Sequence, residues 1–358
     1  MGGAETVAHV GEEERNVMRQ TNPRVVGLAQ ITVALVTLAA CGGAGAGGGD
    51  TEDDTVVESV DLTGVQIAVG SKNFTEQEIL GAITIEVLQA AGATVEDRTG
   101  QGSTAATREA LIAGATDMYW EYTGTGWLVI LGHEEPIADA QQQFDAVAKE
   151  DLQENDITWI APPAPANNTY AIAVRSEVSD PDSEQYDEDL AQVETLSDLS
   201  DLVEQSPEKA TICVASEFAT REDGLPGLEQ EYGFELPDDG VITLDQEDLI
   251  YAAVDKGNAC NFGEVFRTDG RIDSLDLRLI KDDKNFFPLY NPALTVRTQL
   301  LEEHPEIKEL FAPIAEQLDE ETLQRLSTSV DVDGRPVNDV ARDFLNEEGF
   351  LSPQQLNK

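Results

Sequence analysis

Apolar and polar positions alternate along the chain in two different patterns between Val65 and Leu345. Short apolar runs that are rich in β-branched residues are typical of strands buried within a sheet. These runs predict strands at 65–69, 94–97, 157–160, 170–174, 210–214 and 293–296. Amphipathic segments lie between them, and strands that alternate with helices indicate an α/β fold.

The amphipathic segments repeat apolar residues every three or four positions, as helices do when one face packs on a sheet. In the first of them, Ile79, Ile83 and Val87 fall on one face. Thr75 and Glu78 have the spacing of a capping box, which predicts that this helix begins there. We expect helices at 76–91, 104–113, 143–154, 246–256 and 299–318.

Two proline-containing segments, at 161–166 and 288–292, separate groups of expected strands. Proline lacks a backbone N–H and fixes its own φ, so it interrupts both helices and sheet ladders. We expect both segments to be crossings between two αβ lobes. Because the chain crosses twice, lobe one is discontinuous, at 61–167 and 292–358, and lobe two lies at 168–291.

The first 40 residues have the features of a secretory leader. The apolar run at 25–39 is 15 residues long, which is too short for a membrane-spanning helix, and Arg19 and Arg24 precede it. The tetrapeptide Leu-Ala-Ala-Cys, which ends at Cys41, resembles the bacterial lipoprotein signal, in which the cysteine receives the lipid. We expect removal of residues 1–40 and lipid attachment at Cys41; an uncleaved anchor with a chance cysteine is the alternative.

The start of translation has two candidates, Met1 and Met18. Three glutamates at 12–14 do not suit the basic start of a leader, whereas a start at Met18 gives a short basic one. Beyond the leader, glycine-rich and then acidic residues predict a flexible tether at 41–60.

The chain carries 70 Asp and Glu residues against 22 Lys and Arg residues, a formal net charge of −48. A surface of this charge repels nucleic acid and anionic lipid headgroups, so we exclude a nucleic-acid-binding function. The recurring apolar runs argue against disorder, which the charge alone would suggest. Dense acidity keeps a protein soluble where concentrated salt screens its self-repulsion, and we infer a salt-rich habitat.

Beyond the leader, Cys213 and Cys260 make an even pair. A secreted protein lies in an oxidising compartment, where cysteine pairs form and keep disulfides. We therefore expect a disulfide between these two residues, within lobe two.

The sequence has few residues that would support catalysis or metal binding. The histidines, His9, His133 and His304, lie in the leader or among acidic residues. Neither a zinc spacing of Cys and His, nor a Gly-rich phosphate loop, nor a Ser-His-Asp set is recognisable. We expect a protein that is not an enzyme and holds neither cofactor nor metal.

Six short segments stand out in order along the chain: GSKNFTEQ at 70–77, EYTGTG at 121–126, NNTY at 167–170, EFATR at 217–221, FRTDGR at 266–271 and FFPLY at 286–290. They resemble the substrate-binding proteins of ABC importers for glycine betaine, choline and related osmoprotectants. One such match would be weak, but six in sequence, spanning about residues 63 to 350, are specific to the family.

The resemblance implies a type II periplasmic-binding-protein-like fold, in which each lobe is a mixed sheet flanked by helices and the ligand lies in the cleft. It also implies an aromatic cage, because a quaternary ammonium group has no N–H to donate and is attracted by ring faces. The cage positions that it implies are Tyr122, Tyr170, Tyr290 and Phe266. Phe262 competes with Phe266 for its place, and the backbone of Asn168 is implied to touch the cation.

For the carboxylate of the ligand, the resemblance points to Lys72, Thr125 and Arg221. Arg221 could grip a carboxylate through two parallel bonds, with Glu217 holding it in orientation. A salt bridge of Arg221 with Glu217 or Glu222 is the alternative. Without a substrate anion, Lys72 and Arg221 would repel each other, which favours a betaine over choline.

We therefore expect an extracytoplasmic substrate-binding lipoprotein of an ABC transporter, anchored by its lipid to the outer face of the cell membrane. It would bind glycine betaine or a related small quaternary ammonium ligand and deliver it to the membrane subunit of an ABC permease. A choline- or carnitine-binding protein of the same family is the alternative, and a secreted hydrolase is a distant one.

Overall fold

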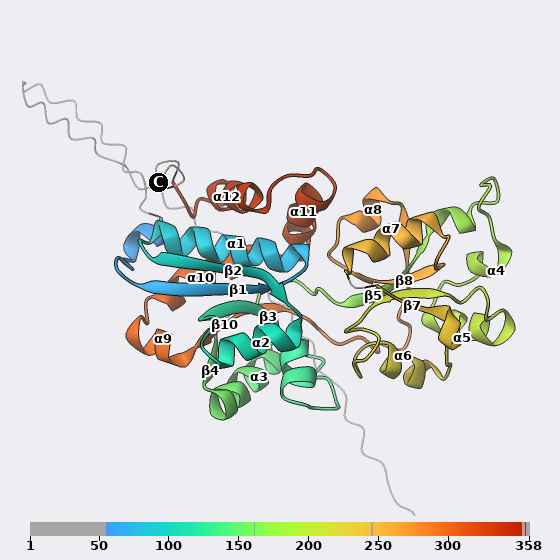
Figure 1. The fold of residues 1–358 in the computed structure, drawn as a ribbon, viewed down its shortest axis with the longest axis horizontal. Helices are drawn as coiled ribbons and strands as arrows, with labels where there is room; N and C mark the ends of the chain where they lie inside the picture. Colours follow the sequence, from blue (N-terminus) through green and yellow to red (C-terminus); the bar gives the residue numbers. More distant parts are fainter. Residues whose placement is uncertain (1–54, 161, 245, 353–354, 356–358) are drawn as a thin grey trace, which may run out of the picture. The chain divides into compact units, whose positions relative to one another are not determined.

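The computed structural model describes residues 55–160, 162–244, 246–352 and 355 of the chain. These residues form two mixed five-stranded sheets, each flanked by helices on both faces (Figure 1). We call the first sheet with its helices lobe one and the second sheet with its helices lobe two. The expected leader, both candidate start residues and Cys41 lie outside the described residues.

The sheet of lobe one has the strand order β2-β1-β3-β10-β4. β1 runs parallel to β2 and β3, whereas β10 is antiparallel to β3 and β4. The strands are β1 (Gln66–Lys72), β2 (Thr94–Gly102), β3 (Met118–Tyr122), β4 (Ile157–Ile160) and β10 (Pro292–Arg297).

Apolar helix faces close both sides of this sheet. Ile79, Ile83 and Val87 of α1 are completely buried, as their shared face predicts. Figure 1 shows α1 and α12 on one side of the sheet and α2 and α3 on the other. The helices of lobe one are η1 (Val56–Ser59), α1 (Thr75–Ala90), α2 (Thr104–Ile112), η2 (Thr125–Ile130), α3 (Ala140–Asn155), α9 (Thr298–Glu303), α10 (Ile307–Gln317), α11 (Glu320–Asp331) and α12 (Val337–Glu347).

The sheet of lobe two repeats the same pattern, with the order β7-β6-β8-β5-β9. β6 is parallel to β7 and β8, and β5 is antiparallel to β8 and β9. Its strands are β5 (Tyr170–Arg175), β6 (Ile212–Ala215), β7 (Val241–Leu244), β8 (Phe262–Phe266) and β9 (Leu277–Ile280). Its helices are η3 (Ser176–Ser179), α4 (Glu188–Ala191), α5 (Leu196–Gln205), α6 (Leu225–Tyr232), η4 (Asp238–Gly240), α7 (Asp248–Lys256) and α8 (Arg271–Ser274).

A disulfide joins Cys213 in β6 to Cys260, two residues before the neighbouring strand β8. Both cysteines are buried in the core of lobe two. The bond therefore fixes the two parallel strands whose ends reach the candidate site described below.

The chain passes between the sheets twice. β4 of the first sheet ends at Ile160 and β5 of the second begins at Tyr170; β9 of the second ends at Ile280 and β10 of the first begins at Pro292. Both connections contain the proline segments noted in the sequence. Prolines at these places interrupt no ladder, because each lies outside the strand or at its first residue.

The capping box expected for the first long helix is absent. The N-cap of α1 is Phe74, which makes no side-chain cap bond, and Thr75 is already the first helical residue. The hydroxyl of Thr75 instead donates to Asp331 Oδ1 at 2.6 Å. Thr75 therefore pairs with Asp331 at the end of α11, which is distant in the sequence, and does not cap its own helix.

The single helix expected at 299–318 is two helices, α9 and α10. The break falls at His304, whose φ of −134° and ψ of 69° are not helical. The residue before a proline is disfavoured in the helical region, and Pro305 follows directly. The periodicity of the segment hid this break because apolar residues continue on both sides of it.

The expectation of a flexible tether at 41–60 is wrong for residues 55–60. Residues 56–59 form η1, with a complete capping box between Thr55 and Glu58. Val57 and Val60 are buried in the core of lobe one. Packing of these two valines therefore places 55–60 in the fold.

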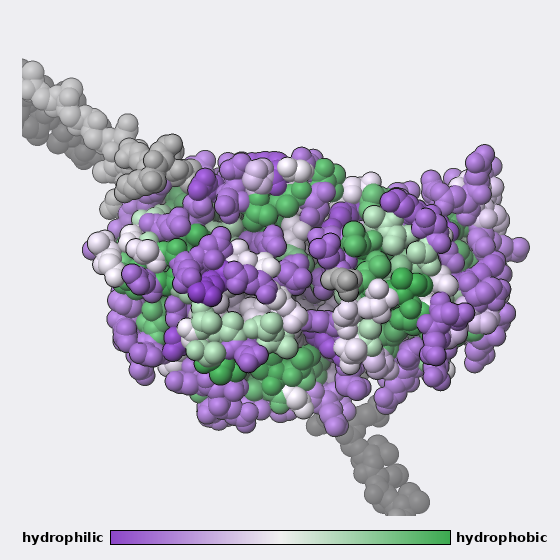
Figure 2. All heavy atoms as spheres, viewed as in Figure 1, coloured by the Kyte–Doolittle hydropathy of each residue, from purple (hydrophilic) through white to green (hydrophobic). Residues whose placement is uncertain are grey.

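Hydrophilic residues cover most of the face drawn in Figure 2, and apolar residues form smaller patches between them. This distribution agrees with the strong acidity of the sequence. None of the helices in the described part of the chain combines the length and the apolar character that a membrane crossing needs.

Candidate functional site

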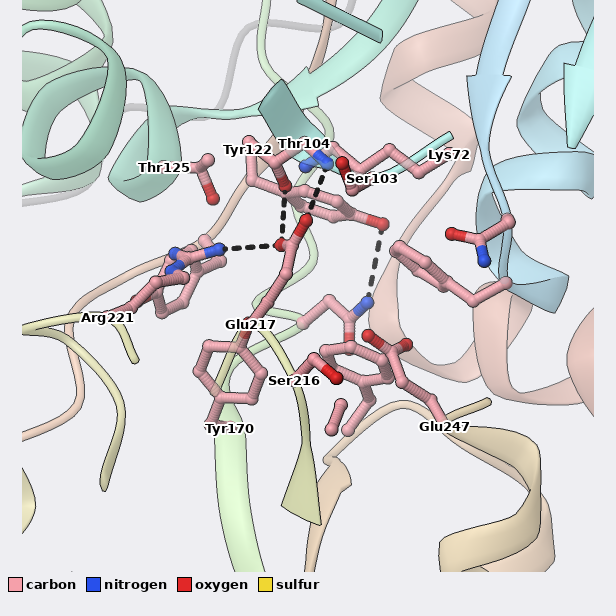
Figure 3. Close-up of a pocket in the computed structure, with 16 residues that line it drawn as sticks. Lys72, Ser103, Thr104, Tyr122, Thr125, Tyr170, Ser216, Glu217, Arg221 and Glu247 are labelled. Carbon is pink, nitrogen blue, oxygen red and sulfur yellow. Dashed lines mark hydrogen bonds and ion pairs between the residues drawn. The ribbon is translucent and has the colours of Figure 1, made fainter. Parts of the chain in front are cut away.

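A cavity of about 140 Å³ lies where residues of both lobes meet (Figure 3). All nine ligand-binding residues expected from the sequence line it: Lys72, Tyr122, Thr125, Asn168, Tyr170, Glu217, Arg221, Phe266 and Tyr290. Seven further residues line it that sequence reasoning missed: Asn73, Phe74, Ser103, Thr104, Ala215, Ser216 and Glu247. The structure thus brings together segments that are nearly 220 residues apart in the sequence.

Several of these residues lie at the ends of strands that reach the cavity. Lys72 is the last residue of β1 and Tyr122 the last of the parallel strand β3. In lobe two, Phe266 ends β8 and pairs with Tyr170, which begins the antiparallel strand β5. Carboxyl ends of parallel strands meet at one edge of a sheet, which is where α/β proteins commonly bind ligands.

Five aromatic rings form a continuous row along the cavity. Phe74 stacks on Tyr122 with ring centroids 6.2 Å apart and on Phe266 at 4.9 Å. Tyr170 continues the row, 5.4 Å from Phe266 and 5.6 Å from Tyr290. These spacings are those of rings in direct contact. The rings of the row therefore pack on one another, stacked from Tyr122 to Tyr170 and edge to face between Tyr170 and Tyr290.

Phe74 is the member of this row that sequence reasoning missed. It stands inside the segment GSKNFTEQ, between Lys72 and the first helix, so its position carried the signal. Of the two competing phenylalanines, Phe266 lines the cavity, whereas Phe262 is completely buried in the core of lobe two.

A buried carboxylate supports the row from behind. Glu76 Oε1 accepts hydrogen bonds from the hydroxyl of Tyr122 at 2.7 Å and from Asn168 Nδ2 at 2.9 Å. Glu76 Oε2 accepts one from the hydroxyl of Thr268, in lobe two, at 2.7 Å. Burial raises the pKa of the Glu76 carboxyl to about 6, although these three bonds lower it. Glu76 thus joins both lobes next to Tyr122.

Asn168 uses its side chain here, beyond the backbone role implied by the resemblance. Its amide donates to Glu76, and its carbonyl oxygen lies 2.7 Å from the hydroxyl oxygen of Thr268, whose single hydrogen the bond to Glu76 uses. Asn168 lies in the first crossing between the sheets. The crossing is therefore hydrogen-bonded to lobe one and in contact with Thr268 of lobe two at the cavity.

Lys72 is already paired within the protein. Its ammonium group donates to Glu121 Oε1 at 2.6 Å, and both side chains are buried. It also lies 5.0 Å from the centroid of the Tyr122 ring. The expected repulsion between two unpaired cations is therefore wrong on this side, because Glu121 neutralises Lys72.

Arg221 is also paired, and with a residue that the sequence did not suggest. Its Nε and Nη2 donate to the two oxygens of Asp223 at 2.7 and 2.5 Å. The hydroxyl of Tyr290 donates to Asp223 Oδ2 as well, at 2.5 Å. The alternative bridge to Glu222 does not form, since Glu222 is exposed and makes no ion pair among the described residues.

Glu217 reaches across the cavity to lobe one. Its Oε1 accepts from the backbone N–H of Thr104 at 2.7 Å, and its Oε2 from the hydroxyl of Thr104 at 2.9 Å. Arg221 Nη1 donates to the same Oε2 at 3.4 Å, so Glu217 does hold Arg221, as expected. Figure 3 shows the carboxylate of Glu217 between Arg221 and Thr104.

Glu247 is the second carboxyl group on the cavity wall. Its Oε2 is buried and has no hydrogen-bond partner within the described part of the chain. Burial raises the pKa of Glu247 well above its ordinary value, and the charges of Glu264 and Glu217 raise it further. The cavity wall is therefore rich in carboxyl groups, whereas each of its two basic groups is paired.

The described residues include no cluster of three or more His, Cys, Asp or Glu side chains that could hold a metal ion. His133 lies outside the cavity, where its ring stacks on Trp127 and its Nε2 is 3.0 Å from Glu150 Oε1. The cavity therefore combines ring faces, hydroxyls and paired charges, a set suited to binding a small polar molecule with an apolar part.

Comparison with known proteins gives a match to one family model over most of the chain. The model of the substrate-binding domain of ABC-type glycine betaine transport systems, OpuAC, matches residues 65–347. The glycine-betaine-binding protein of Pseudomonas aeruginosa is 38% identical over 293 residues, which are 82% of this chain and 91% of the relative. The glycine betaine-binding protein YehZ of Escherichia coli K12 is 34% identical over 290 residues, 79% of this chain and 91% of the relative.

The same likeness extends to three dimensions. The solved structure of ligand-free YehZ from Escherichia coli superposes with a TM-score of 0.57 at 33% sequence identity. The superposition covers 80% of this chain and 99% of that structure. The fold is that of type II periplasmic binding proteins, with two mixed sheets flanked by helices.

Proposed function

The chain belongs to the family of substrate-binding domains of ABC-type glycine betaine transport systems, and on this premise we propose that it binds glycine betaine in the cavity between its lobes. The observation that carries the proposal is the composition of the cavity wall. A row of five aromatic rings meets a group of carboxylate-binding donors within one cavity of about 140 Å³.

The aromatic row suits the trimethylammonium group. A desolvated cation gains roughly 0.5 to 2 kcal/mol from each ring face that it contacts. We propose that the ligand's methyl groups separate rings of this row, in which Phe74 packs between Tyr122 and Phe266 and Tyr170 packs on Phe266. Tyr122, Phe266 and Tyr170 would then form an aromatic cage. Tyr290 and Phe74 would close it, and Asn168 would border it.

The other end of the ligand would meet Arg221 and the start of α2. Arg221 Nη1 is the guanidinium donor not used by Asp223, and the N–H and hydroxyl of Thr104 lie beside it. Thr125 lines the same cavity from lobe one. Together these donors can hold a carboxylate by charge-assisted hydrogen bonds.

Choline remains the second candidate ligand, and one observation favours it. Lys72 forms an ion pair with Glu121, and Arg221 forms one with Asp223. The cavity therefore has no unpaired positive charge that requires an anionic ligand. Glu217 adds a carboxylate to its wall. A ligand with a net positive charge would suit this wall.

Around this binding role we propose the rest of the transport function. Cys41 would carry the lipid after removal of residues 1–40, and the lipid would hold the protein at the outer face of the cell membrane. Lobe one, expected at 61–167 and 292–358 and extended by 55–60 in the structure, and lobe two, at 168–291, would close on the ligand and then dock on the permease. Members of the family are transport binding proteins, so we propose no enzymatic activity.

The acidic composition supports a further proposal, adaptation to a salt-rich habitat. A chain with a net charge of −48 repels itself until counterions screen it. The melting temperature should rise between dilute buffer and molar potassium chloride. A flat or falling melting temperature over that range would contradict the proposal.

Titration calorimetry tests the binding function directly. We expect glycine betaine to bind and to raise the melting temperature, because a ligand that binds only the folded state stabilises it. Glycine, which has the same carboxylate but no methyl groups, is the matched control and should give no binding heat. If glycine betaine and choline both fail to bind, or if glycine binds as tightly as glycine betaine, the proposed function is wrong.

A further inference from the structure

The donors at the anion end of the cavity are already occupied by a carboxylate of the protein. Glu217 accepts from the N–H and hydroxyl of Thr104 at 2.7 and 2.9 Å and from Arg221 Nη1 at 3.4 Å. Nε and Nη2 of Arg221 donate to Asp223. The carboxylate of Glu217 therefore takes up the donors that a bound carboxylate would need (Figure 3).

The two carboxylates next to Arg221 differ in their freedom to move. The side chain of Asp223 is 5% exposed and is held by Arg221 and Tyr290 together. The side chain of Glu217 is 29% exposed, and its longest contact, to Arg221, is also the weakest. Glu217 can therefore turn towards solvent, whereas Asp223 cannot leave without breaking a buried ion pair.

We infer that Glu217 determines ligand specificity by standing in for the carboxylate of the ligand. This inference rests on the proposed function. Glycine betaine has to displace Glu217 to reach Thr104 and Arg221, and one carboxylate then replaces another with no net gain of charge-assisted bonds. Choline has no carboxylate, so Glu217 keeps its bonds and its negative charge stays beside the cation.

The substitution Glu217→Gln tests this role, because it keeps the length of the side chain and removes its charge. We expect the affinity for glycine betaine to rise about tenfold, since a neutral amide competes less well than a carboxylate for the same donors. The affinity for choline should stay within about threefold or fall, because a nearby negative charge is lost. The ratio of the two affinities, measured by titration calorimetry, is therefore the informative readout.

Glu222→Gln is the matched control. Glu222 is exposed, lies five residues further along, and its substitution removes the same charge from the same lobe. We expect the ratio of affinities to stay at its original value in this variant. A role of Glu217 that is only structural would change the melting temperature of Glu217→Gln and would weaken both ligands equally.

The possible outcomes separate this inference from the proposed function. If the unaltered protein binds glycine betaine and Glu217→Gln leaves the ratio unchanged or shifts it towards choline, the inference alone is overturned. If neither protein binds either ligand, both ideas are overturned.

Discussion

The side chains at the two ends of the cavity are held in place by different interactions. At the aromatic end, Tyr122, Phe74, Phe266 and Tyr170 pack on one another through ring contacts at 4.9 to 6.2 Å. Such pairs contribute about 0.5 to 1.5 kcal/mol each beyond the area that they bury. At the anion end, short hydrogen bonds between charged groups hold the side chains, and these are roughly twice as strong as neutral ones.

The difference shows where discrimination between ligands should arise. A cation can separate the rings at small cost and regains contact with their faces. A carboxylate at the other end must replace another carboxylate, so its gain depends on what it displaces. We therefore expect the aromatic end to provide affinity for any quaternary ammonium ligand, and the anion end to choose among them.

The largest expected effect concerns the ion pair at the anion end. Arg221→Ala leaves Asp223 buried without its bidentate partner, and breaking a buried pair in this way costs about 3 to 5 kcal/mol of unfolding free energy. Urea denaturation should show this loss. The double variant Arg221→Ala, Asp223→Asn should recover a large part of it, because the unpaired charge is gone. Equal instability of the single and double variants would contradict a structural ion pair.

The next effect concerns the buried support of the aromatic end. Burial raises the pKa of Glu76 from 4.5 to about 6 in the folded protein, so the folded state holds the proton more tightly than the unfolded chain. Its contribution to stability is complete below about pH 4.5 and is lost as the pH rises through about 6. The loss is about 2 kcal/mol, since one pKa unit corresponds to about 1.36 kcal/mol.

The variant Glu76→Gln should remove this part of the pH dependence. Asp331, whose pKa burial also raises to about 6, acts in the same direction and remains in both proteins. Denaturation series between pH 4 and 7 should therefore give a smaller slope of unfolding free energy for the variant. If both slopes agree, Glu76 does not titrate in this window.

A smaller effect tests the aromatic end alone. Tyr170→Leu keeps an apolar side chain and removes a ring face, so glycine betaine and choline should each lose about tenfold in affinity, or about 1.4 kcal/mol. Their ratio should not change. Tyr186→Leu, at a tyrosine that is 43% exposed, is the control and should bind both ligands normally. A loss confined to one ligand would break the division between the two ends.

The smallest effect comes from salt. Choline is a net cation, and the field of an acidic protein attracts it from a distance, whereas zwitterionic glycine betaine feels little of this field. Between dilute buffer and molar potassium chloride, we expect choline to lose about threefold in affinity relative to glycine betaine. Parallel titrations of both ligands at each salt concentration check this. An equal change for both ligands would show that salt acts on the fold.

Local patterns in the sequence predicted much of this fold. Short apolar runs rich in β-branched residues identified strands such as β1, and apolar residues repeated every three or four positions identified helices such as α1. The prolines at 161–166 pointed to a connection between sheets. Two predictions failed, one for a reason that is not local and one because the apolar pattern was given more weight than a local proline. Thr75 does not cap its helix, because its hydroxyl donates to Asp331 in a helix that is distant in the sequence. The helix expected at 299–318 breaks before Pro305, although its apolar pattern continues across the break.

For the site too, some residues could be predicted from the sequence and others could not. The family segments named Tyr122, Tyr170 and Arg221, because each lies within a recognisable motif. The partners that decide their chemistry were missed although they lie close by in sequence, Asp223 two residues after Arg221 and Glu76 within 70–77, because a motif does not say which side chains will pair. Thr104 could not be found either, because no pattern indicates that a helix start in lobe one would face lobe two.

Two connections between the lobes flank the cavity, and they have a consequence for the speed of binding. Glu76 meets Thr268 on one side and Glu217 meets Thr104 on the other. We expect ligand entry to require that the lobes part, a motion that typically takes microseconds to milliseconds in hinged proteins. Because this opening precedes contact with the ligand, we expect glycine betaine and choline to share similar association rate constants at molar salt, where the field that attracts choline is screened. Whatever difference in affinity Glu217 creates should then appear as a difference in how long each ligand stays bound.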